Sequence, residues 1–183
     1  KRKVNNLKSH AAKLVEEDKK MTQVMIDKVF SFGELGFQEF ETSKYLSNIL
    51  EENGFELQYN ISDIPTSWLA KWSNGSGGPV IALGSDFDGV PSTSQYPGVA
   101  YEKPVVEGAP GHGEGHNIGL PIVITAALSI KKVMIENNIN GTLLLWPGVA
   151  EEILGSKAWY VRDGYFDNVD MCIFTHVSSN MST

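Results

Sequence analysis

Apolar positions along the chain recur at two spacings, one typical of helices and one typical of strands. Residues 4–29 carry apolar side chains three and four positions apart, which predicts an amphipathic helix. The run "EFETSKYLSNILEENGF" repeats this spacing and then reaches Gly54, a residue that commonly ends a helix. The run "NIGLPIVITAALSIKKVMIENN" predicts a more apolar helix, and "SKAWYVRDGYF" predicts a short one.

Short apolar runs between these helices predict strands. The runs "FELQYNIS" and "SWLAKW" predict two strands, and the "NGSGGP" that follows them predicts a hairpin turn. The runs "PVIALGSDFDGVP", "TLLLWPGVAEE" and "VDMCIFTHVSS" predict three more strands, with Cys172 at a buried position, and the longest loop is expected at about residues 91–115. This alternation indicates an α/β fold with a mixed, largely parallel sheet flanked by helices on both faces.

Composition limits the classes of function. The 183 residues are 42% hydrophobic, which suits one domain with a sizeable core. No run approaches the ~20 apolar residues of a membrane-spanning helix, so we expect a soluble chain with no membrane partner. The net charge of −7, without clustered Lys and Arg, argues against a nucleic-acid partner. The one cysteine excludes an internal disulfide; a cytoplasmic location is favoured, with a processed periplasmic or secreted form as the alternative.

Side chains with metal-binding chemistry gather in the predicted loops that follow strands, where open α/β sheets collect their functional groups. One of these loops, "GAPGHGEGHNIGLP", is rich in glycine, which lets the backbone fold tightly where side chains converge. The candidate residues are Asp86, Asp88, His112, Glu114, His116, Glu151, Glu152 and His176.

The mixture of imidazole and carboxylate groups favours a transition metal over calcium or magnesium. Adjacent carboxylates after an apolar strand would repel each other in a dry site, and a divalent cation removes that repulsion. Neighbouring side chains such as Glu151 and Glu152 point in different directions, so one can bind metal while the other faces the metal-bound water. A metal-bound water with a pKa lowered toward ~7, beside a carboxylate that accepts its proton, can hydrolyse an amide.

Each candidate group also has a structural interpretation. Glu114 and His116 of the glycine-rich loop could form a hydrogen-bonded pair that closes the loop. Glu151 and Glu152 could stabilise the first turn of a helix. The two aspartates could form a turn around Gly89, and His176 could be a structural histidine at a strand end. For His112, a role in the loop is an equal alternative to metal binding. The loop lacks the Lys and Ser/Thr of a P-loop, which disfavours nucleotide binding.

Several motifs in order along the chain resemble those of a known family. The segments "GHGEGHN", "GVAEE" and the strand-end "TH" resemble the metal-dependent amidohydrolase and carboxypeptidase family, which includes aminoacylases and indole-acetyl-amino-acid hydrolases. The segments "FGELGFQEFETSKYLSNILEENGFEL" and "ALGSDFDGVPSTSQ" resemble its aminobenzoyl-glutamate hydrolase branch, and the similarity spans roughly residues 29–183.

The resemblance implies a zinc-peptidase-like fold and hydrolysis of the amide bond of an N-acyl or aminobenzoyl amino acid or small peptide. It implies two divalent ions, of zinc, manganese or cobalt, a small-molecule amide substrate, and a homodimer in the full-length parent. The alternative is a non-catalytic fragment or regulatory partner that retains the fold.

The resemblance also implies the metal ligands. They would be Glu114, His116, Glu152 and His176. Glu114 stands where this branch normally has a cysteine, and a carboxylate there could still bind or bridge two metals.

Further roles follow for the remaining motif residues. Glu151 would be the general base that activates water, and Asp88 would be an acid that holds the site in register. Asp86 and His112 would lie beside the ligands. Residues 1–183 would be the amino-terminal portion of one catalytic domain; the family's lid and dimerisation domain, its carboxyl-terminal strands and a last histidine ligand are expected to be absent from this chain.

Overall fold

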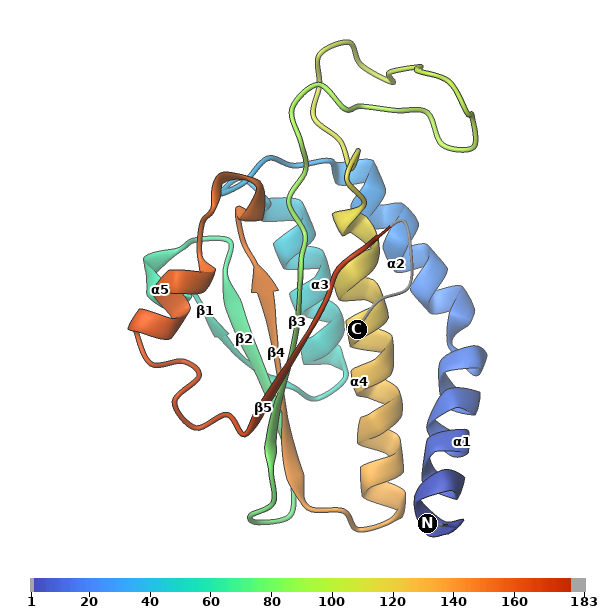
Figure 1. The fold of residues 1–183 in the computed structure, drawn as a ribbon, viewed down its shortest axis with the longest axis vertical. Coiled ribbons are helices and arrows are strands. Elements are labelled where there is room, and N and C mark those ends of the chain that lie inside the picture. Colours follow the sequence, from blue (N-terminus) through green and yellow to red (C-terminus); the bar gives the residue numbers. More distant parts are fainter. Residues whose placement is uncertain (1, 179–183) are drawn as a thin grey trace.

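A five-stranded sheet forms the centre of the protein (Figure 1). The structure is a computed structural model and describes residues 2–178. The strands are β1 (Glu56–Tyr59), β2 (Trp68–Asn74), β3 (Val80–Asp86), β4 (Gly141–Gly148) and β5 (Met171–Thr175). Their order in the sheet is β1-β2-β4-β3-β5. The β1–β2 and β2–β4 pairs are antiparallel, whereas the β4–β3 and β3–β5 pairs are parallel. The predicted mixed sheet is confirmed, with parallel pairing limited to its β4, β3 and β5 side.

The glycine-rich turn "NGSGGP" does not form the predicted hairpin. It joins β2 to β3, but β4 lies between these two strands and pairs with both of them. A turn signal indicates where the chain reverses, whereas pairing depends on which strand gains most from burial. All but one of the β4 residues are buried, so this strand takes the centre of the sheet.

Helices cover both faces of the sheet. They are α1 (Arg2–Glu17), α2 (Lys19–Phe32), α3 (Phe40–Glu52), α4 (Gly119–Glu136) and α5 (Lys157–Arg162), with the short 3-10 helices η1 (Ile61–Asp63), η2 (His116–Ile118) and η3 (Glu151–Ile153). The helix predicted over residues 4–29 is therefore two helices that meet at Asp18. In Figure 1, α4 and α1 lie on one side of the sheet and α5 lies on the other. The ring of Tyr160 in α5 packs edge-on against Trp146 of β4, with 6.1 Å between ring centroids.

The helix α4, together with η2, is the most apolar long segment of the fold. Residues His116–Glu136 are long and apolar enough to cross a membrane by length and composition, so the expectation that no run approaches that length is wrong. In this fold 56% of the segment's most apolar window is buried, and Leu120, Ile124 and Ala127 are fully buried. This burial is the pattern of a helix that packs into a protein core.

The strand β5 is an edge strand among the described residues. Met171 is 53% exposed, Ile173 is 47% exposed, and Cys172 is also exposed. The prediction of a buried Cys172 is therefore wrong. An apolar run predicts a strand, but it does not reveal whether the strand lies in the centre of the sheet or at its edge.

Candidate metal centre

The candidate residues lie where the three parallel strands end. Asp86 is the last residue of β3, the two glutamates of η3 follow β4, and His176 follows β5. The glycine-rich loop precedes a helix instead: it ends at His116, where η2 begins and leads directly into α4. Because the carboxyl ends of parallel strands meet at one edge of a sheet, side chains far apart in the sequence converge there.

His116 occupies the middle of this cluster. Its side chain is 3% exposed, and its Nδ1 lies 3.1 Å from the backbone oxygen of Asp88. That hydrogen bond requires the proton on Nδ1, which leaves the lone pair on Nε2 available. The Nε2 atom lies 2.9 Å from Oε2 of Glu114, 3.9 Å from Oε2 of Glu151 and 4.0 Å from Oδ2 of Asp86.

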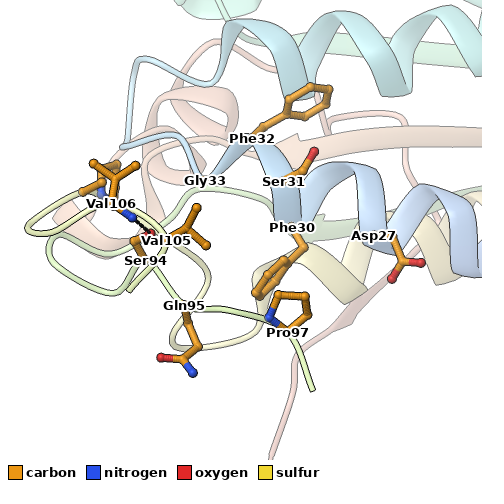
Figure 2. A pocket seen from close by; sticks show the side chains of 13 residues that line it. Asp27, Phe30, Ser31, Phe32, Gly33, Ser94, Gln95, Pro97, Val105 and Val106 are labelled. Atoms are coloured by element: carbon orange, nitrogen blue, oxygen red, sulfur yellow. Dashed lines mark hydrogen bonds between the residues drawn. The ribbon is translucent and has the colours of Figure 1, made fainter. Parts of the chain in front are cut away.

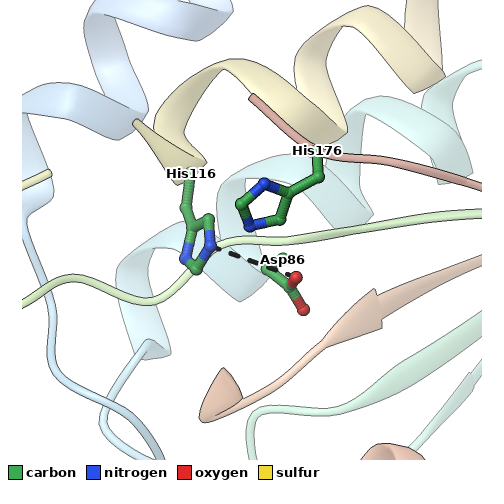
Figure 3. Close-up of side chains that lie close together, drawn as sticks. All are labelled: Asp86, His116 and His176. Atoms are coloured by element: carbon green, nitrogen blue, oxygen red, sulfur yellow. Dashed lines mark ion pairs between the residues drawn. The ribbon is translucent and has the colours of Figure 1, made fainter. Parts of the chain in front are cut away.

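The carboxylate of Glu114 lies between two imidazole rings. Its Oε2 faces His116, and its Oε1 lies 3.4 Å from Nε2 of His176. The two rings are nearly perpendicular, with centroids 5.4 Å apart (Figure 3). A carboxylate with one oxygen toward each histidine has the geometry of a bridging group.

Two sets of side chains could each hold a metal ion. One set is Asp86, His116 and His176, and the other is Glu114, His116 and Glu152, with the ligand atoms of each set within 4.8 Å of one another. The structure therefore brings together the four residues predicted as ligands, and it adds Asp86 to the groups within reach.

Asp88 joins the loop after β3 to η3. It is 1% exposed, and its Oδ2 accepts a hydrogen bond of 3.0 Å from the backbone nitrogen of Glu152. Its Oδ1 lies 3.3 Å from Nδ1 of His116. Asp88 therefore contacts both the imidazole of His116 and the turn that carries Glu152.

The surrounding carboxylates control the charge of His116. Burial lowers the pKa of His116. The hydrogen bond with Asp88 and the charges of Glu114 and Asp86 raise it by more than that, so the net pKa is about 9. Without a metal the imidazole is therefore a counter-ion to the acidic groups. A divalent cation would replace that proton, which is the usual linkage between metal binding and proton release.

Asp86 forms an ion pair that the sequence did not predict. The Nζ of Lys157 lies 2.8 Å from Oδ1 and 3.0 Å from Oδ2 of this buried carboxylate. Burial raises the pKa of Asp86 and Lys157 lowers it, with a net value of about 6. Lys157 lies in a predicted helix, where a lysine is normally solvated, so no local pattern pointed to this contact.

Glu39 is a second residue that the sequence did not reveal. Its fully buried carboxylate accepts hydrogen bonds from the backbone nitrogen of Ala150 and from the hydroxyl of Thr66, each at 2.9 Å. Ala150 adopts a left-handed conformation with φ of 55° and immediately precedes Glu151. Glu39 therefore supports the strained turn that presents the paired glutamates, across 111 positions of sequence.

His112 belongs to neither set of possible ligands. Its Nε2 lies 3.1 Å from the backbone oxygen of Val29 in α2. Burial lowers the pKa of His112 to about 4, so the imidazole is neutral at neutral pH. Its contact anchors the glycine-rich loop to the end of α2.

One pocket lies beside this anchor rather than at the metal centre (Figure 2). It has a volume of about 670 Å³ between the end of α2 and the long loop, and none of the candidate metal ligands lines it. Phe30 lines the pocket, and the centroid of its ring lies 6.5 Å from that of His112.

Comparison with known proteins gives matches in sequence, although no protein-family model matches the chain. The chain is 33% identical over 162 residues to a component of the p-aminobenzoyl-glutamate hydrolase of Escherichia coli K12, covering 88% of this chain and 33% of that protein. It is 32% identical over 139 residues to hippurate hydrolase of Campylobacter jejuni, covering 75% of this chain and 33% of that protein. The chain thus spans about a third of the length of these relatives.

Solved structures share the fold. A dinuclear metal binding peptidase of the M20 family from Bacillus subtilis superposes with a TM-score of 0.65 at 23% identity, over 88% of this chain and 44% of that one. An aminobenzoyl-glutamate utilization protein from Klebsiella pneumoniae gives a TM-score of 0.64 at 16% identity, over 92% of this chain and 46% of that one.

Proposed function

We propose that this chain, which is a relative of the M20 family of amidohydrolases, carries the metal-binding part of an enzyme that hydrolyses an amide bond. The sequence matches to a p-aminobenzoyl-glutamate hydrolase subunit and to hippurate hydrolase support this relationship. We propose an N-acyl or aminobenzoyl amino acid, with aminobenzoyl-glutamate as the first candidate, as the substrate of the full-length protein. The name of the Escherichia coli relative supports this choice.

The observation that carries the proposal is the convergence of carboxylates and imidazoles around the buried ring of His116. The convergent groups are Asp86, Asp88, Glu114, His116, Glu151, Glu152 and His176. So many carboxylates in a partly buried site repel one another unless cations neutralise them. The mixed oxygen and nitrogen donors fit a divalent transition metal. A bound ion of this kind would supply a water of lowered pKa and polarise the scissile carbonyl.

Each residue has a distinct task in this proposal. Glu114, His116, Glu152 and His176 would hold the metal. Glu151, whose Oε2 lies 3.9 Å from Nε2 of His116, would accept the proton of the attacking water and return it to the leaving nitrogen. Its side chain is 32% exposed, so a substrate has access to it.

We propose two metal ions, of zinc, manganese or cobalt, rather than one. Glu114 directs one oxygen toward His116 and the other toward His176, so the two histidines could each bind a different ion. This arrangement supports Glu114 as a group that bridges two ions. A small-molecule amide substrate, a homodimer of the full-length protein and a cytoplasmic location complete the proposal.

A second candidate function is a regulatory or binding partner that retains the fold without catalysis. The observation that favours it is Glu114 itself, because the resemblance places a cysteine ligand at this position. The two candidates differ in whether the centre binds metal tightly.

The test is the metal content of the purified and dialysed chain, measured by elemental mass spectrometry beside a Glu152→Ala control. The proposed function predicts one or two transition-metal ions per chain, with a loss in the control. It also predicts that Glu151→Gln retains the metal and abolishes turnover of aminobenzoyl-glutamate in the full-length protein. Absence of metal from the wild type and the control would favour the binding partner, and turnover by Glu151→Gln would overturn the assigned base.

A further inference from the structure

Lys157 is the one lysine or arginine that forms an ion pair with the candidate metal centre within residues 2–178. Its Nζ contacts both carboxylate oxygens of Asp86, at 2.8 Å and 3.0 Å, and lies 4.4 Å from the centroid of the Phe174 ring. Asp86 is fully buried, whereas the side chain of Lys157 is 38% exposed. The ammonium group is therefore held between an aromatic face and a buried carboxylate at the edge of the site.

The same carboxylate also faces the histidines (Figure 3). Oδ2 of Asp86 accepts the hydrogen bond from Lys157 and lies 4.0 Å from Nε2 of His116. A metal ion bound by this oxygen would lie close to the ammonium group and be repelled by it. Lys157 and a metal ion therefore compete for Asp86.

The end of β4 provides the space for this ion pair. Gly148 lies opposite Asp86 in the parallel register of β3 and β4. A Cβ atom at Gly148 would overlap Oδ1 of Asp86 and lie 2.9 Å from Cε of Lys157. Only glycine leaves room at this position for both partners.

The charges of the centre agree with this arrangement. Five carboxylates surround the histidines: Asp86, Asp88, Glu114, Glu151 and Glu152. Lys157 balances one of them, and two divalent cations would balance the other four. With Lys157 paired to Asp86, the four remaining negative charges equal the positive charge of two divalent ions.

We propose that Lys157 is a positioning residue that keeps Asp86 out of the coordination sphere of the metal. Coordination is thereby restricted to the glutamates and histidines of the centre. The inference rests on the proposed function, because it presumes that the centre binds a divalent ion. It adds a residue that decides which carboxylates become ligands.

The test begins with Lys157→Met, which keeps the length of the side chain and removes its charge. The freed Asp86 should join the ligands, so the dissociation constant for Zn²⁺, measured by isothermal titration calorimetry on the 183-residue chain, should fall by roughly tenfold or more. The visible spectrum of the Co²⁺-loaded variant should change because coordination gains an oxygen. Lys157→Arg keeps the charge and should bind Zn²⁺ as the wild type does. Lys157→Gln replaces Lys157→Met if the latter does not fold.

A double variant separates positioning from a purely structural ion pair. Adding Asp86→Asn to Lys157→Met removes the freed ligand, so the gain in Zn²⁺ affinity should disappear. Zn²⁺ binding by Lys157→Met that equals the wild type or is weaker, or a gain that persists in the double variant, would overturn the inference alone. Failure of both the wild type and Lys157→Met to bind Zn²⁺ would overturn the proposed function and the inference together.

Discussion

Asp88 accepts a hydrogen bond from the backbone nitrogen of Glu152, with 3.0 Å between Oδ2 and that nitrogen. The carboxylate of Asp88 is buried, and its other oxygen lies 3.3 Å from Nδ1 of His116. One side chain thus fixes the turn that carries a proposed ligand and places a negative charge beside the imidazole of another. The orientation of the centre depends on this contact as well as on the ligands themselves.

Asp88→Asn should weaken metal binding. The asparagine oxygen can still accept the hydrogen bond from Glu152, but the negative charge near His116 is lost. We expect the dissociation constant for Zn²⁺ to rise by about tenfold, as for other residues that orient metal ligands, and isothermal titration calorimetry measures it. The control is Asp163→Asn, whose carboxylate pairs with Arg162 instead. Equal Zn²⁺ affinity in wild type and Asp88→Asn would contradict the orienting role.

Glu114→Cys should change the metal preference of the centre. A thiolate is a softer ligand than a carboxylate, so the variant should favour Zn²⁺ over Mn²⁺ more strongly than the wild type does. Competition between the two ions, followed by elemental analysis, gives the ratio directly. Glu107→Cys, in the same loop but outside both sets of possible ligands, controls for a new thiol. An unchanged ratio in Glu114→Cys would show that position 114 is not a ligand.

Gly84→Ala should destabilise the sheet beneath the centre. Gly84 pairs with Trp146 across β3 and β4, and a Cβ atom there would lie 2.6 Å from the indole ring. Overpacking of this kind costs about 1–3 kcal/mol of unfolding free energy, which urea denaturation measures. Combining Gly84→Ala with Trp146→Phe should cost less than the sum of the single changes, because the smaller ring leaves space. Additive losses would show that the ring does not cause the effect.

The sequence predicted the elements of the fold better than their pairing. Apolar runs and helical spacing located the five strands and the segments that form α-helices, because these patterns are local, although they did not show that α1 and α2 are separate helices. The place of β4 between β2 and β3 is not local, and the exposure of Cys172 follows from the edge position of its strand. The order of the strands depends on which faces of the sheet the helices cover. The residues that determine this packing are distributed over the whole chain.

The candidate site divides in a similar way. Short motifs at strand ends and in the glycine-rich loop pointed to every residue of the two possible ligand sets, since these motifs are local in the sequence. Glu39 and Lys157 were not predicted to take part. Their partners, Ala150 and Asp86, are 111 and 71 positions away in the sequence. An acid at the start of a helix or a lysine on one normally faces solvent, so only the folded structure reveals that these two support the centre.

Glu39→Gln should alter how the stability of the protein depends on pH. Burial raises the pKa of Glu39 above its ordinary value of 4.5, while its hydrogen bonds with backbone groups and Thr66 only partly oppose that shift. The folded protein therefore holds this proton more tightly than the unfolded chain does. The stability gained from protonation is fully present below pH 4.5 and is lost as the pH rises through the folded-state pKa. Glutamine resembles the protonated acid at every pH, so the variant should not lose this contribution.

The prediction concerns the difference between the unfolding free energies of wild type and Glu39→Gln. As the pH rises above 4.5, the wild type should lose stability relative to the variant, and urea denaturation at a series of pH values between about 4 and 8 measures this. The matched control is Glu41→Gln, which removes an exposed carboxylate two positions along the chain. A difference for Glu39→Gln that stays constant with pH would mean that the carboxylate beside Ala150 titrates alike in the folded and unfolded chains. Burial at the turn before Glu151 would then not raise the pKa of Glu39.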